Sequence, residues 1–313
     1  MSAQHTQVIF GGSGLMGEAL VKRLLKEGSQ SITIFDAKLP SLEIMSDSRI
    51  RFVKGNVVEL GRQDIEDILG DAETLFFKVG MLGDPYFSAD IAMAWNFINV
   101  NAMALARITP ALKESRVRTV VVDSSITAVS DFSRNSSIRE LDGIGSPTNF
   151  YGVSKAILED VCALNHNHEN LRFRVVRYPR VYSSTQAGFL INFAKKILSN
   201  EPICLIGNPD KLLDLIHIED AVEVAFRCMD FEGEEKIFHA SYGNAKSLRK
   251  IIDILCEYAG KSKYPVILSN EGETPREPIN ASLADTYSSR RLGTRFQFSL
   301  EAILRDALKV AAT

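Results

Sequence analysis

The sequence predicts an α/β protein with a doubly wound parallel sheet and a smaller C-terminal α/β portion. Three observations support this fold class. Apolar, strand-like segments alternate with helix-like segments over residues 1–178, which is the pattern of a parallel sheet joined by helical crossovers. A glycine-spaced turn follows the first apolar segment. The chain has 313 residues, 45% of them hydrophobic and 24% charged, as in an ordinary globular protein with a large core.

The first predicted unit is a strand over residues 8–10 that runs into a turn and then a helix over 15–27. Three glycines follow the strand at a spacing of three residues: Gly11, Gly14 and Gly17. Such a turn brings the backbone close to a pyrophosphate at the N-terminus of the helix. A strand over 31–35 ends in Asp36, near the offset of about 20 residues at which an acid binds an adenosine ribose. We therefore predict a Rossmann-type unit that binds a dinucleotide.

The next segments continue the predicted sheet. Strands are expected over 50–54, 74–77, 119–123 and 173–178, and helices over 63–69, 87–114 and 151–165, of which 87–114 is interrupted. The turn Gly55–Val57 follows the third strand at the carboxyl edge of the sheet, where ligands gather. Lys78 ends the fourth strand, and its side chain either approaches the cofactor phosphates or projects into solvent.

Beyond residue 178 the predicted elements become shorter. Helices are expected over 187–198, 220–229 and 247–258, with a strand over 203–205. Residues 1–178 are therefore expected to form the dinucleotide-binding Rossmann domain and residues 179–313 the substrate-binding portion, with the two interleaved. No internal repeat or low-complexity linker separates them.

Tyr151 and Lys155 are the residues that best fit a catalytic role. They lie four residues apart, and so on one face of the predicted helix. A nearby cation would lower the phenol pKa from its ordinary value of about 10, so that Tyr151 could exchange a proton with a substrate oxygen during hydride transfer. Ser125, just past the fifth strand, could hydrogen-bond the same oxygen. Tyr and Lys at this spacing are also common on solvated helix faces, but the serine and the glycine turn favour chemistry.

Further segments complete a series along the chain. After the glycine turn and Gly55–Val57 come, in order, Asn99–Ala102, Ser124–Ser125, Tyr151–Lys155, Arg177–Tyr182, Leu215–Asp220 and Leu292–Glu301. Together these segments resemble the extended branch of the short-chain dehydrogenase/reductase superfamily, the NAD-dependent epimerase/dehydratase family. The resemblance covers nearly the whole chain.

This resemblance implies functional residues and partners. The catalytic residues would be Ser125, Tyr151 and Lys155. The cofactor-binding residues would be Gly11, Gly14, Leu15, Met16, Gly17, Asp36, Asn56, Val57, Lys78, Asn99, Tyr151, Lys155 and Tyr178. The substrate-binding residues would be Ser125, Ile126, Arg180 and Arg276. The implied cofactor is NAD rather than NADP, because Asp36 would repel a 2′-phosphate. The implied assembly is a homodimer through the helices around 92–114 and 151–165.

Four departures from the family pattern affect which substrate and which cofactor contacts are expected. Residues 125–127 are Ser-Ile-Thr instead of the Thr-Asp-Glu typical of sugar-nucleotide dehydratases, which disfavours 4,6-dehydration. Arg180 replaces a common asparagine, and Leu213 replaces the arginine that binds the diphosphate in many epimerases. Arg180 or Arg276 could supply this charge instead. Asn56 replaces an aspartate, so we expect a weakened contact with the adenine.

The expected function is hydride transfer between NAD and a secondary alcohol or ketone carbon of a sugar or nucleotide sugar. An epimerase or a reductase is favoured over a 4,6-dehydratase. Two alternatives stay open: an NAD-dependent dehydrogenase of a small hydroxy or keto substrate, and a non-catalytic NAD-binding scaffold or sensor. The complete set of Ser125, Tyr151 and Lys155 argues against the second alternative.

The composition argues against several other partners. A net charge of −3 gives no broad basic surface for nucleic acid or anionic lipid. The longest apolar segment contains three asparagines and an arginine, so no membrane span is expected, and no signal peptide pattern precedes the first strand. The four scattered cysteines are expected to be buried thiols of a cytoplasmic protein. His166 and His168 would face apart on a helix, so no metal site is expected.

Overall fold

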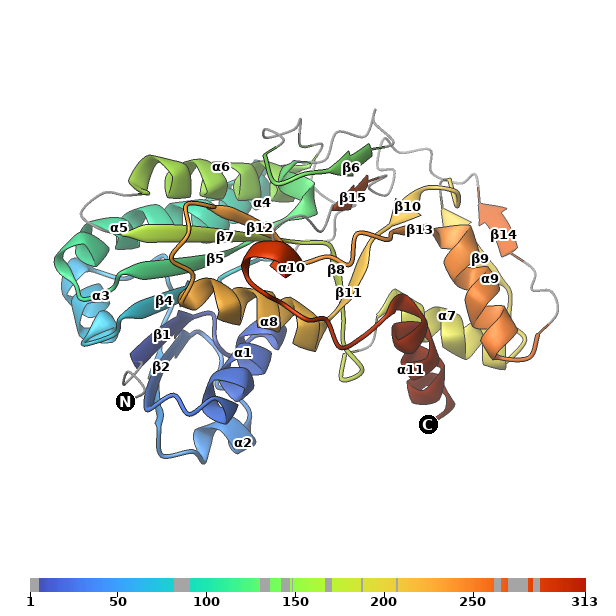
Figure 1. The fold of residues 1–313 in the computed structure, drawn as a ribbon, viewed down its shortest axis with the longest axis horizontal. Helices are drawn as coiled ribbons and strands as arrows, with labels where there is room; N and C mark the ends of the chain where they lie inside the picture. Colours follow the sequence, from blue (N-terminus) through green and yellow to red (C-terminus); the bar gives the residue numbers. More distant parts are fainter. Residues whose placement is uncertain are drawn as a thin grey trace.

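The fold is taken from a computed structural model of the chain. It describes residues 6–81, 91–129, 136–141, 147, 149–166, 171–186, 188–206, 208–261, 266–269, 281–283 and 288–313. A large sheet with its covering helices forms one end of the molecule, and α7, α9 and α11 gather at the other end (Figure 1).

The large sheet has seven parallel strands in the order β12-β7-β5-β4-β1-β2-β3. The strands are β1 (Thr6–Phe10), β2 (Ser31–Asp36), β3 (Ile50–Lys54), β4 (Thr74–Phe77), β5 (Thr119–Ser125), β7 (Arg172–Tyr178) and β12 (Ile237–His239). The order reverses between β1 and β4, which is the switch point at which doubly wound sheets bind ligands. The predicted fold class and six predicted strands are confirmed. The seventh strand, β12, was not predicted.

Helices cover both faces of this sheet (Figure 1). The helices are α1 (Leu15–Lys26), α3 (Arg62–Leu69), α4 (Ile91–Ile98), α5 (Ala104–Glu114), α6 (Phe150–Asn165) and α8 (Ile218–Met229). In β1, Val8 and Phe10 pack with residues of α3 and α5, while Ile9 between them packs with α1 and α8. This alternation follows from the period of two in a strand, and burial on both faces explains why the central strands are almost entirely apolar.

The predicted interruption of the long helix is confirmed over 91–114, while residues 87–90 of that prediction lie outside the described residues. A π-helical turn, Asn99–Met103, separates α4 from α5. Such turns are rare and occur mostly inside α-helices at functional sites. The turn faces α6, so the irregular backbone lies beside the helix that carries Tyr151 and Lys155.

The C-terminal portion has its own core. It contains α7 (Phe189–Leu198), α9 (Leu248–Tyr258), α11 (Leu300–Ala312) and β9 (Ile203–Ile206), and buried aliphatic residues from these elements pack together. The shorter elements are α2 (Leu42–Met45), β6 (Ser136–Ile138), β8 (Arg180–Tyr182), β10 (Leu212–Leu213), β11 (Leu215–His217), β13 (Lys246–Ser247), β14 (Val266–Ser269), β15 (Ala281–Leu283) and α10 (Ser288–Arg291). The predicted helices and strand of this portion are confirmed. However, β12 is a strand of the large sheet and α8 packs against that sheet, so the chain returns to it after residue 178.

His217 and Asp220 join α8 to the C-terminal tail. The His217 imidazole accepts a hydrogen bond from the Glu219 N–H and stacks on Phe298, with 3.6 Å between ring centroids. The Asp220 carboxylate accepts from the Gln297 and Phe298 N–H groups at 2.8 and 3.0 Å. These contacts give this histidine a structural role.

The prediction of four buried thiols is wrong for one cysteine. Cys162, Cys228 and Cys256 are buried, but Cys204 is exposed. Cys204 lies in β9, which pairs with β14 in a two-stranded sheet. Within the described part of the chain, no helix combines the length and the apolar character needed to cross a membrane.

Candidate active site

The glycine turn after β1 is packed against its neighbours too closely for side chains. Gly11 has a left-handed backbone (φ 84°), and a Cβ here would lie 2.7 Å from the carbonyl carbon of Lys78. A Cβ on Gly17 would lie 2.6 Å from the Cα of Gly12, because α1 begins directly against the turn. Both distances are well inside van der Waals contact. The glycines at these two positions are therefore required by the backbone itself.

The N-terminus of α1 can bind an anion. Gly14 is its N-cap residue and supplies no side-chain cap, so the N–H groups of the first turn, which begins with Leu15 and Met16, keep open hydrogen-bonding capacity. Asp36, at the end of the neighbouring β2, accepts from the Ser13 N–H at 2.9 Å. The glycine turn, the open helix end and the acid lie together at the carboxyl edge of the sheet, as a dinucleotide requires.

Replacing Gly17 with alanine is expected to lower the free energy of unfolding by about 1–3 kcal/mol, because the new Cβ overlaps the turn. Urea denaturation measures this loss. Gly14→Ala is the matched control: its Cβ would lie 3.6 Å from the Gly11 oxygen, an ordinary contact. Equal losses in the two variants would contradict the close packing at Gly17.

The turn after β3 is stabilised by Asn56. Its Oδ1 accepts from the Val58 N–H at 3.3 Å and its Nδ2 donates to Glu59 at 2.8 Å. Val57 is buried in the core. Because the Asn56 amide is already used within the turn, a weak contact with an adenine stays a prediction.

Ser125, Tyr151 and Lys155 come together at the ends of β5 and α6. The Asn149 side chain caps α6 by accepting from the Gly152 N–H at 2.7 Å, which fixes where the helix starts. The Tyr151 hydroxyl hydrogen-bonds Ser125. The Lys155 Nζ lies 5.9 Å from the centroid of the Tyr151 ring. The structure therefore assembles the three predicted side chains, and Ile126 follows as a buried neighbour.

The expected decrease in the phenol pKa is not found. Burial raises the pKa of Tyr151 to about 12, the hydrogen bond from Ser125 opposes this rise, and the charge of Asp123 adds to it. The Lys155 Nζ donates a hydrogen bond to the Asp123 carbonyl at 2.7 Å. Burial also lowers the pKa of Lys155 to about 8. For both groups loss of hydration is the largest cause of the shift, and the sequence pattern could not indicate their burial.

Lys78 does not project into solvent. Its side chain is 0% exposed, and its Nζ donates to Asp123 Oδ1 at 2.6 Å and lies 3.4 Å from the Tyr178 hydroxyl. Burial raises the pKa of Tyr178 well above its ordinary value, so this phenol stays protonated. Contacts of Lys78 and Tyr178 with the cofactor stay predictions.

Asn101 is a buried residue beside the helix of Tyr151 that the sequence pattern did not single out. The predicted residue, Asn99, accepts from Arg107 on the exposed side of the π-helical turn. Asn101 is 0% exposed: its Oδ1 accepts from the Met81 N–H at 2.7 Å and its Nδ2 donates to Ser154 Oγ at 3.0 Å. It thereby joins the loop after β4 to the helix of Tyr151. The sequence contains two asparagines two residues apart, and it does not indicate which of them has its side chain buried.

A second buried polar group holds α6 to the sheet. Arg177, in β7, binds Glu159 of α6 through two nitrogens, with the shortest N–O distance 2.7 Å. Ser124, beside Ser125, donates to the same carboxylate. Arg177 and Glu159 are 1% and 4% exposed. The helix that carries Tyr151 and Lys155 is therefore fixed to both β5 and β7.

The substrate side is described in part. Arg180 is exposed, and its guanidinium lies 5.4 Å from the centroid of the Phe189 ring. Leu213 packs against the C-terminal core. Arg276 lies outside the described residues. Of the two predicted cations, the structure therefore describes Arg180 alone.

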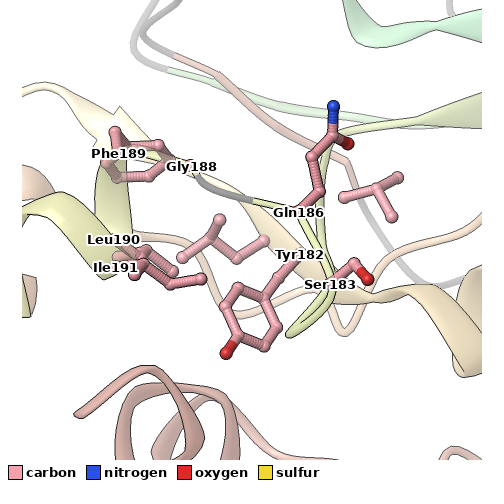
Figure 2. A pocket seen from close by; sticks show the side chains of 9 residues that line it. Tyr182, Ser183, Gln186, Gly188, Phe189, Leu190 and Ile191 are labelled. Atoms are coloured by element: carbon pink, nitrogen blue, oxygen red, sulfur yellow. The ribbon is translucent and has the colours of Figure 1, made fainter. Parts of the chain in front are cut away.

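A small cavity lies directly after Arg180 in the chain, between β8 and α7 (Figure 2). In this view the polar side chains of Ser183 and Gln186 lie on one side, and the apolar side chains of Phe189 and Leu190 lie on the other. Its volume is about 70 Å³, against the roughly 300–1,000 Å³ of ordinary ligand pockets. It could hold only a fragment of a nucleotide sugar.

No metal centre is found among the described residues, which contain no cluster of three His, Cys, Asp or Glu side chains. His166 accepts a hydrogen bond from the Phe173 N–H at 3.2 Å, and His168 lies outside the described residues.

Known proteins resemble this chain over most of its length. A sequence model of the NAD dependent epimerase/dehydratase family matches residues 7–240. The UDP-glucose 4-epimerase of Rickettsia bellii is 24% identical over 90% of this chain and 79% of that protein. The putative UDP-glucose 4-epimerase of Methanocaldococcus jannaschii is 20% identical over 79% of this chain and 80% of that protein.

A solved structure shares the fold. It is UDP-glucuronic acid 4-epimerase from Bacillus cereus in complex with UDP-glucuronic acid and NAD, with a TM-score of 0.83 at 19% identity. The match covers 98% of this chain and 99% of that one. Both portions of the chain, including the C-terminal elements, therefore follow one known architecture.

Proposed function

Because this chain belongs to the NAD-dependent epimerase/dehydratase family, we propose that it is an epimerase of a nucleotide sugar. The observation that carries the proposal is the meeting of Ser125, Tyr151 and Lys155 at the sheet edge that also holds the glycine turn. NAD is the cofactor, and when bound it accepts and returns a hydride. The open end of α1 and Asp36 would hold it.

The chain's own residues would handle the proton. Tyr151 takes the proton of the substrate hydroxyl and later returns it, and Ser125 holds the same oxygen through its hydroxyl. Lys155 supplies the positive charge that stabilises the phenolate. Burial raises the pKa of Tyr151 to about 12, so the charge of Lys155 has to act against this loss of hydration.

The relatives support a nucleotide sugar as substrate. The named relatives act on UDP-glucose, and the solved neighbour binds UDP-glucuronic acid. Epimerisation is favoured over dehydration because residues 125–127 carry no acid. Residues 1–178 would form the NAD-binding domain and residues 179–313 the substrate-binding portion, with α8 and β12 completing the first. Arg180 is our candidate for the residue that binds the diphosphate, because Leu213 is apolar and packs against the C-terminal core.

A second candidate is an NAD-dependent dehydrogenase of a small hydroxy or keto substrate. Leu213 favours it, because this apolar residue replaces the family's diphosphate-binding arginine. A non-catalytic scaffold is disfavoured, because a scaffold has no use for the assembled phenol, hydroxyl and ammonium. We also propose a homodimer through α4 to α6, where Trp95 and Leu164 are 66% and 81% exposed. The four unpaired cysteines support a cytoplasmic location.

Asp36→Ala is expected to shift cofactor preference by about 10-fold or more toward NADP. The change removes the carboxylate that accepts from the ribose 2′-hydroxyl of NAD and that repels the 2′-phosphate of NADP. The ratio of the dissociation constants for NADH and NADPH, measured by fluorescence, checks this. Asp36→Asn is the matched variant, since it removes the charge but keeps an acceptor for the Ser13 N–H. An unchanged ratio in Asp36→Ala would show that another residue sets the preference.

The function is tested with purified protein, NAD and a panel of compounds: UDP-glucose, UDP-glucuronic acid, UDP-N-acetylglucosamine, lactate and malate. The proposal predicts that proton NMR shows conversion of at least one nucleotide sugar to its epimer, without net formation of NADH. Accumulation of NADH with a hydroxy acid and no epimer would favour the dehydrogenase.

A further inference from the structure

Lys78, Asp123 and Lys155 form one buried cluster at the carboxyl edge of the sheet. Two ammonium groups meet on one residue: Lys78 donates to the Asp123 carboxylate at 2.6 Å, and Lys155 donates to the Asp123 main-chain oxygen at 2.7 Å. The side chain of Lys78 is 0% exposed and that of Asp123 is 13% exposed. Water therefore screens these charges little, and each one acts on the others.

The groups around the cluster leave Asp123 as its counter-charge. Among the described residues, the other ionisable groups that act on it are Tyr178 from β7, Tyr151, Glu159 and Cys162 from α6, and Cys228 from α8. Glu159 is already bound by Arg177 and Ser124. The thiols and phenols are neutral near pH 7 because burial raises their pKa values.

We propose that Lys78 and Asp123 are paired positioning residues that set the charge of Lys155. The importance of this pair rests on the proposed function, in which Lys155 is the cation beside Tyr151. Asp123 favours the protonated form of Lys155, and Lys78 opposes it while holding the Asp123 carboxylate in place.

The sign of the effect follows from the burial of Lys155. Its pKa is lowered to about 8, first because of burial, and the Asp123 charge limits this decrease. The amine is therefore mostly protonated at pH 7 and loses its proton as the pH rises through 8. Removing the Asp123 charge shifts this titration to lower pH, and removing the Lys78 charge shifts it to higher pH.

The test is the titration of Lys155 by NMR in protein labelled with ¹³C at the lysine ε-carbon, with the Lys155 signal assigned by its absence in Lys155→Met. The protein is used as purified and again with saturating NAD. Asp123→Asn keeps the main-chain acceptor and is expected to lower the Lys155 pKa by about one unit or more, whereas Lys78→Met raises it by a similar amount. In the double variant Lys78→Met/Asp123→Asn, the Lys155 pKa is expected to lie between the values of the two single variants.

Two controls accompany the test. Lys22→Met, in an exposed ion pair with Glu43, is expected to leave the Lys155 titration unchanged. Lys78→Arg keeps the charge and is expected to restore the wild-type value. If Asp123→Asn does not fold because Lys78 is left unpaired, the double variant, in which the Lys78 charge is removed as well, is compared with Lys78→Met instead.

An unchanged Lys155 titration in Lys78→Met and Asp123→Asn overturns the proposal. So does an unchanged titration in Lys78→Met with a loss of NAD affinity, because Lys78 would then act on the cofactor phosphates. The titration in protein as purified requires no substrate. Failure to bind NAD or to convert a nucleotide sugar would therefore refute the proposed function and leave this result standing.

Discussion

Replacing Tyr151 with phenylalanine is expected to lower kcat by about 10²–10⁴-fold, the range typical for loss of a general acid–base group. The phenol is the one group in the assembled set that can both accept and return the substrate proton, since Ser125 is hydrogen-bonded to it and Lys155 is turned toward the Asp123 carbonyl. Phenylalanine keeps the ring and its edge-to-face contact with Phe97. Steady-state kinetics with the nucleotide sugar identified in the panel measures the loss.

The fold of this variant is expected to survive, so NADH binding and the denaturation midpoint serve as its controls. Tyr258→Phe is the matched control variant, because this tyrosine lies in α9 of the C-terminal portion under the guanidinium of Arg305, remote from Ser125. Its kcat should equal that of the wild type. Full activity of Tyr151→Phe would remove Tyr151 from the proton-transfer role.

Replacing Arg177 with methionine is expected to lower the free energy of unfolding by about 3–5 kcal/mol, the cost of leaving one buried partner of an ion pair without the other. Glu159 is 4% exposed, so its carboxylate could not be hydrated after the change. Ser124 would remain its neighbour but cannot neutralise its charge. Because Glu159 holds α6 to the sheet, kcat should fall as well. Urea denaturation measures the first effect.

Two variants qualify this result. The double variant Glu159→Leu/Arg177→Met removes both charges and is expected to be more stable than Arg177→Met alone. Arg62→Met, in an exposed ion pair with Glu66 and Glu114, should leave the denaturation midpoint unchanged. A double variant as unstable as the single one would show that lost packing, and not the unpaired charge, causes the effect.

The first βαβ unit could be predicted almost to the residue because its signals are local. The glycine spacing, the apolar stripe of α1 and the acid after β2 are each patterns among residues that lie close together in the sequence, next to the element that they mark. β12 could not be predicted in this way. It is three residues long, and its strand conformation depends on pairing with β7, some 60 residues earlier in the chain.

The site residues show the same division. Ser125, Tyr151 and Lys155 follow from spacing and strand order. The contact between Lys78 and Asp123 depends on β4 and β5 being adjacent, and the inward orientation of Asn101 depends on a π-helical turn. The expected decrease in the Tyr151 pKa was wrong for a related reason, because burial by the surrounding elements decides its sign.

The central claim is that one site both removes a hydride and returns it to the same carbon. It is tested most directly with the converted nucleotide sugar carrying deuterium on the carbon that is inverted, and UDP-glucose deuterated at C4 is the first choice. An epimerase that works in this way leaves the deuterium on that carbon, and no NADH accumulates. Release of the deuterium to NADH in solution, or its exchange with water, would contradict it.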